Sequence, residues 1–199
     1  MKDRQWISEK QIRLWLVTLA VVLGIGFRMY GLGDRVYWVD EVATSIRISG
    51  YTRAEVTAQL SDGIPRTPGE LQQFLHPAPD LSLAQVLRAL SQSPEHAPLY
   101  FLLAHLWTKL WGSGVVAMRS LSVLFSLISL ALIGQLASQL FNSAKTGAIA
   151  TTLLALSPFF VSYAQEARPY SLWSATLLWS SLALWNAMGN APENQKQNA

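Results

Sequence analysis

The chain has 199 residues, of which 51% are hydrophobic and 14% are charged, whereas soluble domains carry about 25% charged residues. Its formal net charge is only +3, and the basic residues form no stripe, which argues against a nucleic-acid-binding surface. There is no cysteine, so disulfides, thiolate nucleophiles and cysteine-ligated metals are excluded. This composition is typical of an integral membrane protein.

Apolar runs that are long enough to cross a bilayer predict an all-α integral membrane fold with about four spans. A span needs about 20 apolar residues, and the runs that meet this length are 14–33, 120–141, 146–165 and 169–189. Arg28 is the one charge within the first run, and we expect its side chain to reach the lipid headgroups. Residues 1–189 then form the membrane domain, and 190–199 form a polar, disordered tail.

A long polar segment, 34–119, separates the first two spans and is expected to contain short helices at about 40–48, 54–60 and 81–90. Within it, the apolar stretch 98–111 is too short for a span. Its leucines share one helical face, away from His105 and Lys109. This pattern predicts an interfacial helix whose basic residues face headgroup phosphates or snorkel. A short, tilted span is the alternative.

Basic residues before the first span (Lys2, Arg4, Lys10 and Arg13) predict a cytoplasmic N-terminus. With four spans, the segment 34–119 and the short turn around Glu166 and Arg168 both lie outside the membrane on its external side. A fifth span at 98–111 would instead place these two polar regions on opposite sides. The four-span topology therefore predicts that their side chains meet.

The acidic pair Asp40–Glu41 follows Trp38 at the expected start of a helix. Adjacent carboxylates near a membrane face suit a divalent cation, and one of them suits a general base that deprotonates an acceptor. The alternative is structural: Asp40 caps the helix and Glu41 is solvated in its first turn.

Two further polar groups lie at the ends of apolar segments. His96, ahead of the interfacial helix, suits a phosphate contact or proton donation, but it also fits an ordinary surface histidine. Arg168 suits a lipid phosphate because its planar fork binds two oxygens, and Glu166 supplies another carboxylate. Alternatively, Glu166 and Arg168 pair with each other and hold a tight turn.

In this order, the motifs resemble family 39 type glycosyltransferases, a class that includes protein O-mannosyltransferases and aminoarabinose transferases of lipid A. The resemblance rests on Trp-Val-Asp-Glu at 38–41, Glu-His-Ala-Pro-Leu-Tyr-Phe-Leu-Leu at 95–103, Met-Arg-Ser-Leu-Ser at 118–122, and the stretch from Ser157 to Leu172. It implies a GT-C type transmembrane helix bundle with juxtamembrane helices in the first external loop.

The resemblance also implies roles for individual residues. Asp40 corresponds to the acidic residue assigned to acceptor activation or metal binding, with Glu41 beside it. The usual His-Pro-Pro stretch corresponds to His96-Ala97-Pro98, with one proline replaced by alanine. Glu166 corresponds to the acidic position after the third span, with Arg168 close by. Tyr100 and Tyr170, in the matching stretches, are the remaining substrate-binding candidates.

The implied function is inverting transfer of a sugar from a polyprenyl-phosphate donor to an acceptor, at the external face of the plasma (inner) membrane. No nucleotide-binding domain is expected. Because the family's chains continue with more spans, we expect a truncated or split form, or a second polypeptide that supplies the missing helices. A non-catalytic fragment or assembly partner is the alternative. A transporter or channel subunit is disfavoured, because the spans nearly lack charges.

Overall fold

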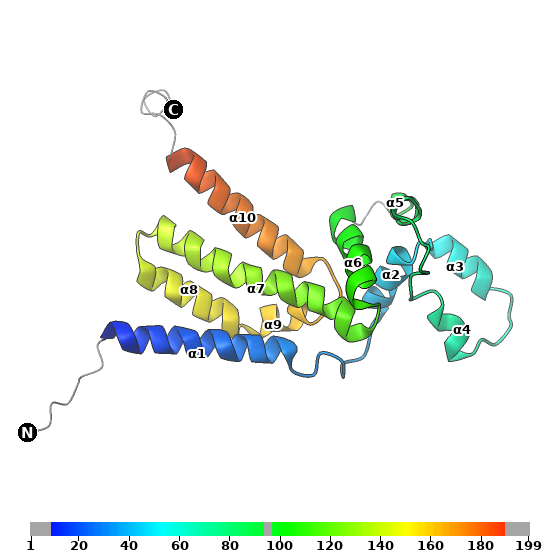
Figure 1. Ribbon diagram of the computed structural model, residues 1–199, viewed down its shortest axis with the longest axis horizontal. Coiled ribbons are helices and arrows are strands. Elements are labelled where there is room, and N and C mark those ends of the chain that lie inside the picture. The colour runs from blue at the N-terminus through cyan, green and yellow to red at the C-terminus, as the bar shows by residue number, and fades with distance from the viewer. Residues whose placement is uncertain (1–8, 94–96, 190–199) are drawn as a thin grey trace, which may run out of the picture.

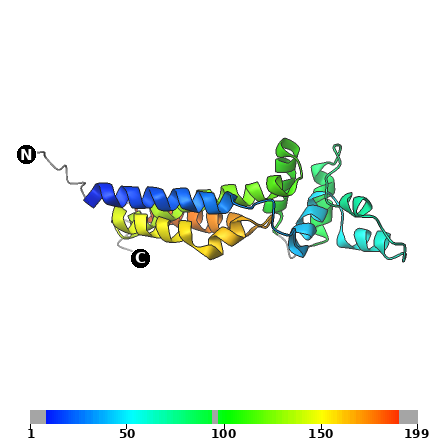
Figure 2. The same ribbon diagram turned by 90° about the horizontal axis from the view of Figure 1, so that it is seen from below.

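The computed structural model describes residues 9–93 and 97–189. These residues form ten helices and no strand. Five helices (α1 and α7 to α10) lie side by side as an elongated bundle, and α2 to α6 gather at one end of it (Figure 1; Figure 2 shows the same arrangement from below). The expected all-helical membrane fold is confirmed.

The bundle contains the apolar helices that the sequence predicted, with shifted ends. Their bounds are α1 (Glu9–Met29), α7 (Val115–Leu140), α8 (Ala144–Leu156), α9 (Pro158–Ala164) and α10 (Tyr170–Gly189). The segments Gln11–Met29 and Val115–Leu140 are long and apolar enough to cross a membrane, and α8 and α9 make a third span if the bent pair is one. Helix α10 is not among these segments, because its tryptophans, serines and asparagine lower its mean hydropathy. The count of four spans therefore stays a prediction.

The expected continuous span 146–165 is broken in the structure. Helices α8 and α9 meet at a 60° bend, with Ser157 between them. Proline has no N–H and its ring clashes with the carbonyl four residues earlier, so Pro158 leaves the carbonyl of Leu154 without its helical donor. A proline inside an apolar run is the local cause of the bend.

Arg28 supplies the donors that this bend requires. Its Nη2 donates to the Leu154 carbonyl at 3.2 Å and its Nη1 to the Ala155 carbonyl at 2.8 Å, while its Nε donates to Ser126 Oγ of α7 at 2.8 Å. The side chain is fully buried. Our expectation that Arg28 reaches the headgroups is therefore wrong: the guanidinium points into the bundle, where orphaned carbonyls take the place of water.

Glycines let α7 and α8 approach closely. A Cβ added at Gly147 would lie 2.5 Å from the Gly134 carbonyl oxygen and would also meet the Ser138 side chain. Small residues at such contacts allow helix backbones to pack in a membrane, where dispersion rather than exclusion of water drives association.

The helices at the end of the bundle follow the predicted loop pattern closely. Their bounds are α2 (Val39–Ile48), α3 (Arg53–Leu60), α4 (Pro68–Gln72), α5 (Leu83–Ser91) and α6 (Pro98–Trp111). Capping boxes begin α3, α4 and α5, with Thr52, Thr67 and Ser82 as the respective caps. Helix α4 was not predicted from the sequence, and α6 occupies the residues of the expected interfacial helix.

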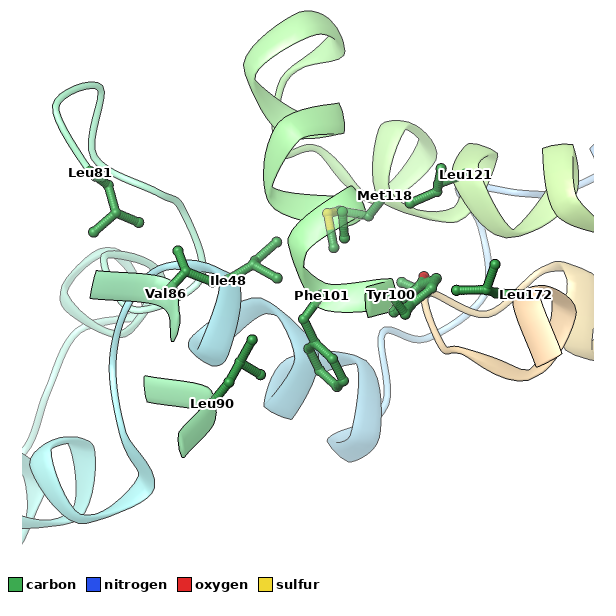
Figure 3. Packing of buried hydrophobic residues seen from close by; sticks show 11 residues of the cluster. Ile48, Leu81, Val86, Leu90, Tyr100, Phe101, Met118, Leu121 and Leu172 are labelled. Carbon is green, nitrogen blue, oxygen red and sulfur yellow. The ribbon is translucent and has the colours of Figure 1, made fainter. Parts of the chain in front are cut away.

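A hydrophobic core joins this end to the bundle. Side chains of α2, α5, α6, α7 and α10 meet there, among them Ile48, Val86, Phe101, Met118 and Leu172 (Figure 3). The leucine face of α6 is turned outward, since Leu99, Leu106 and Leu110 are exposed.

The polar face of α6 contacts the rest of the protein. The buried His105 ring pairs through Nδ1 with the Ile48 carbonyl at 3.0 Å, and Lys109 donates to the Leu81 carbonyl at 3.1 Å. For His105 the expectation that it faces headgroup phosphates or snorkels is wrong, whereas Lys109 is exposed and its contact with headgroups stays a prediction. Burial lowers the pKa of His105, so its neutral form is favoured in this position.

Candidate active site at the end of the bundle

Asp40 and Glu41 are neighbours in the sequence but lie in different surroundings. Both are in the first turn of α2, whose N-cap is Trp38; the expectation that Asp40 caps the helix is therefore wrong. The Asp40 side chain is 39% exposed, whereas the Glu41 side chain is fully buried. The expectation that Glu41 is solvated is therefore also wrong. Asp40 alone of this pair is open to an acceptor.

Glu41 forms a buried ion pair with Arg119 of α7. Arg119 Nε donates to Glu41 Oε1 at 2.8 Å, and Nη2 donates to Oε2 at 2.7 Å. The Arg119 side chain is 1% exposed. This two-pronged geometry satisfies both charges, which is what a buried ion pair requires.

The same guanidinium also holds the segment that leads from α1 to α2. Arg119 donates to the carbonyls of Leu32 at 2.8 Å, Arg35 at 3.2 Å and Val36 at 3.1 Å. Sequence reasoning assigned Arg119 no role, although an arginine at the edge of an apolar run signals a buried partner. The partner itself is far along the chain and has no local signature.

The turn between α9 and α10 completes this junction. The backbone N–H of Ala167 donates to Glu41 Oε1 at 2.8 Å. The amide of Gln165 donates to the carbonyls of Phe27 at 2.7 Å and Tyr30 at 2.9 Å, which satisfies the end of α1. The structure therefore brings the turn against α2, as a shared site for Asp40 and Glu166 requires.

Arg168 lies between this turn and Asp40. Its Nη2 is 3.5 Å from Asp40 Oδ2, and its Nη1 donates to the Asp40 carbonyl at 3.3 Å and to Thr44 Oγ1 at 3.4 Å. These contacts are long, and the buried Nε has no hydrogen-bond partner. The alternative in which Arg168 pairs with Glu166 is replaced by this pairing with Asp40, and the guanidinium keeps unused donor capacity.

Glu166 carries an unsatisfied oxygen beside this cation. Its Oε2 is buried and has no hydrogen-bond partner. Burial, followed by the negative charge of Glu41, raises the pKa of Glu166, while Arg168 and Arg119 oppose the shift. Buried polar atoms in folded proteins nearly always have a hydrogen-bond partner. A proton, a cation or a bound substrate group would each satisfy this oxygen.

An open cavity of about 340 Å³ runs between α7, α8, α9 and α10. Tyr170 lines it, and the Arg168 guanidinium carbon lies 5.7 Å from the centre of the Tyr170 ring. Most of the lining is apolar or aromatic, with serines among it; Phe159, Phe160, Tyr163, Trp173 and Ser126 contribute. The volume falls within the range of small-ligand sites.

Of the predicted substrate-binding residues, Tyr100 is not part of this arrangement. Tyr100 is buried in the core, where its hydroxyl pairs with Ser122 Oγ at 3.0 Å, and burial raises its pKa. His96 lies outside the described residues. Of the remaining candidates, Asp40, Glu166, Arg168 and Tyr170 are gathered around the turn, and Glu41 holds the turn in place.

The carboxylates present are too few to enclose a metal ion by themselves. No group of three His, Cys, Asp or Glu side chains suited to a metal occurs within residues 9–93 and 97–189. The free oxygen of Glu166 and the exposed Asp40 are the oxygen ligands that the site offers. A hard divalent cation held by one or two carboxylates takes its remaining ligands from water and substrate phosphate.

These features define a helical membrane protein with a carboxylate–guanidinium site where its bundle meets its loop helices. The family described as dolichyl-phosphate-mannose-protein mannosyltransferase matches residues 95–194, half of the chain, and the chain belongs to this family. Membership implies a glycosyltransferase kind of activity. No curated protein and no solved structure matches the chain.

Proposed function

We propose that this chain forms the acceptor-activating part of a GT-C type glycosyltransferase that takes a sugar from a polyprenyl-phosphate donor at the external face of the membrane. The observation that carries the proposal is the pairing of an exposed carboxylate, Asp40, with a weakly engaged guanidinium, Arg168. The first suits proton removal and the second suits a phosphate leaving group.

Asp40 is the proposed general base. Its carboxylate is partly exposed at the start of α2, and its ion pair within the described part of the chain is the long one to Arg168. A base must lie within hydrogen-bond reach of the proton that it removes, and an exposed oxygen permits this. We assign Glu41, which was predicted as catalytic, the role of a positioning residue instead, because both of its oxygens already accept hydrogen bonds.

Arg168 is the proposed phosphate ligand. A planar guanidinium binds two phosphate oxygens at once, and Arg168 has a buried Nε without a partner. Charge that develops on the leaving phosphate would be stabilised by this preorganised cation. The partnerless oxygen of Glu166 supports a divalent cation as an additional phosphate ligand.

The cavity beside Tyr170 is the proposed place for the donor's first isoprene units. It adjoins Arg168 through the Tyr170 ring, and its walls are mainly apolar. A polyprenyl phosphate combines an anionic head with a branched hydrocarbon tail, so an arginine against the Tyr170 ring of an aromatic cavity matches both parts.

The proposed reaction is a single displacement at the anomeric carbon. The acceptor O–H or N–H loses its proton to Asp40 as its oxygen or nitrogen bonds to the sugar carbon. The bond from that carbon to the phosphate oxygen breaks, and its electron pair leaves with the polyprenyl phosphate, facing Arg168. Attack from the face opposite to the leaving group inverts the configuration.

The test measures release of polyprenyl phosphate from radiolabelled polyprenyl-phosphate hexoses by the full chain in nanodiscs. Asp40→Asn should lower turnover at least about a hundredfold, as expected for loss of a general base. Asp80→Asn, which removes an exposed carboxylate of the loop, is the matched control and should retain turnover. Undiminished release by Asp40→Asn would exclude Asp40 as the base.

The alternative function is a non-catalytic membrane module that assembles with an enzyme. One observation favours it: the family match begins at residue 95 and therefore does not include α2, which carries Asp40. In that case the wild-type chain would release no polyprenyl phosphate by itself and would co-purify with a catalytic partner.

A further inference from the structure

A second groove lies at the other end of the bundle, away from the loop helices. It is formed by α1 and α8 and has a volume of about 440 Å³. Arg13 and Lys145 contribute its charged walls, and Leu16, Val17, Ile149 and Leu153 contribute most of its apolar lining. We call it the α1–α8 groove. In Figure 2 both helices begin at the same end, far from α2 to α6.

Two basic side chains of this groove have no acidic partner among the described side chains. Arg13 and Lys145 are both exposed, and no carboxylate among the side chains that the structure describes contacts either of them. Lys145 also lies in the first turn of α8, where the partial positive charge of a helix start opposes a cation. Two cations and a helix start around one groove repel each other, and an anion between them would relieve this repulsion.

The apolar part of the groove continues along the helices toward the middle of the bundle. From Lys145 to Leu153 α8 advances about 12 Å, which is long enough for a phosphate followed by the first carbons of an acyl chain. Leu16, Ile149 and Leu153 are largely exposed, so this lining faces the surrounding lipid rather than other helices of the described chain.

We propose that the α1–α8 groove binds one anionic phospholipid, with its phosphate between Arg13 and Lys145 and one acyl chain along Leu16, Ile149 and Leu153. Basic pockets between transmembrane helices at headgroup level have the chemistry that anionic lipids recognise. Since α1 spans the bundle, this headgroup lies at the membrane face opposite to Asp40. The inference does not depend on the proposed glycosyl transfer.

The experiment measures lipid binding to the full chain in detergent by native mass spectrometry, with phosphatidylglycerol and phosphatidylcholine as the probes. The wild-type chain should retain one phosphatidylglycerol in preference to phosphatidylcholine. Arg13→Gln combined with Lys145→Gln should weaken phosphatidylglycerol binding about thirtyfold, since each basic residue near a membrane surface adds about 1 kcal/mol. Equal retention of both lipids would overturn the proposal.

Three further variants separate charge, shape and folding. Arg35→Gln combined with Arg53→Gln makes the same charge change at exposed positions outside the groove and should leave binding unchanged. Ile149→Trp fills the groove while keeping both cations and should also abolish the bound lipid. If the Gln variant does not fold, Arg13→Lys with Lys145→Arg should retain binding.

The same titration distinguishes a lipid from a free anion. Glycerol 3-phosphate presents the same charged group without an acyl chain and should compete poorly. Competition by glycerol 3-phosphate at the concentration of the lipid, or unchanged phosphatidylglycerol binding in the Gln variant, would each overturn a lipid site.

Discussion

The α7–α8 contact in the bundle and the junction at the end of the bundle are held together by different forces. Along α7 and α8, glycines bring the backbones close, and contacts are mainly those of small and apolar side chains. At the junction, Arg119, Glu41, Gln165 and the Ala167 N–H connect α1, α2, α7 and the turn before α10 through buried hydrogen bonds. Nonspecific packing permits many arrangements of helices, whereas such directional bonds permit few.

The geometry of the candidate site therefore depends on the junction rather than on the packing of the bundle. Among the described residues, the Asp40 side chain has only a long contact with Arg168. The neighbouring Glu41 fixes the start of α2 to Arg119 and to the turn that carries Arg168. A precise arrangement of reacting groups depends on rigid support around them. We therefore expect a substitution that breaks the junction to lower the free energy of unfolding more than a substitution within the bundle.

The largest effect is expected for Arg119→Met. This change leaves Glu41 as a buried, unpaired charge and removes donors from the carbonyls of Leu32, Arg35 and Val36. Breaking one side of a buried pair costs about 3–5 kcal/mol, measured as the free energy of unfolding in detergent. Arg119→Met combined with Glu41→Leu should recover part of the loss. A single variant as stable as wild type would contradict the importance of the junction.

A smaller effect is expected for Arg28→Met, which removes the donors at the bend between α8 and α9. Each buried carbonyl left without a partner costs about 1–3 kcal/mol. Pro158→Ala restores an N–H that can donate to the Leu154 carbonyl, so the double variant should lose less than the sum of the two single changes. Unfolding titrations of all four chains measure this coupling, and strict additivity would show that Arg28 does not replace the missing donor.

Within the bundle, Gly147→Ala should destabilise the chain by about 1–3 kcal/mol, because the added Cβ meets the Gly134 carbonyl and Ser138. Gly26→Ala is its control, since nothing lies within 4 Å of a Cβ there, and it should be neutral or slightly stabilising. Thermal unfolding in detergent compares the two. Equal melting temperatures would mean that the α7–α8 contact accommodates the added Cβ without loss of stability.

The smallest effect is expected for Glu166→Gln, and it depends on pH. Because the folded state raises the pKa of Glu166 above its ordinary 4.5, the folded chain holds this proton more tightly than the unfolded chain. Stability from this group is therefore full below 4.5 and falls as pH rises through the raised value. Glutamine carries no such proton, so its melting temperature should fall less from pH 5 to pH 8. Parallel profiles would contradict the shift.

The apolar runs and their spacing were sufficient to predict the helical fold, because a span and an amphipathic helix each leave a local pattern. The break at Pro158 was also readable, since proline inside a run marks a helix end, but the run was interpreted by its hydrophobicity alone. Arg28 was misplaced because its partners are carbonyls of another helix, and orphaned carbonyls become visible only when the bend is known.

The candidate site was predicted only in part, because local motifs can be read from the sequence and distant partners cannot. The motifs located Asp40, Glu166, Arg168 and Tyr170, which the structure gathers around one turn. The distinction between Asp40 and Glu41 was beyond the sequence, because it depends on Arg119, which lies 78 residues away. Which of two adjacent carboxylates is buried depends on which one a distant cation binds, and the local sequence does not contain this information.

The distance of Glu41 from its partners also sets an order for biosynthesis. Glu41 precedes Arg119 by 78 residues and Ala167 by 126 residues, and ribosomes add about 5–20 residues per second. The start of α2 therefore leaves the ribosome about 4–16 s before Arg119 and about 6–25 s before Ala167. During this interval the nascent loop carries an unneutralised carboxylate, and the site is assembled last, when the turn before α10 has been made.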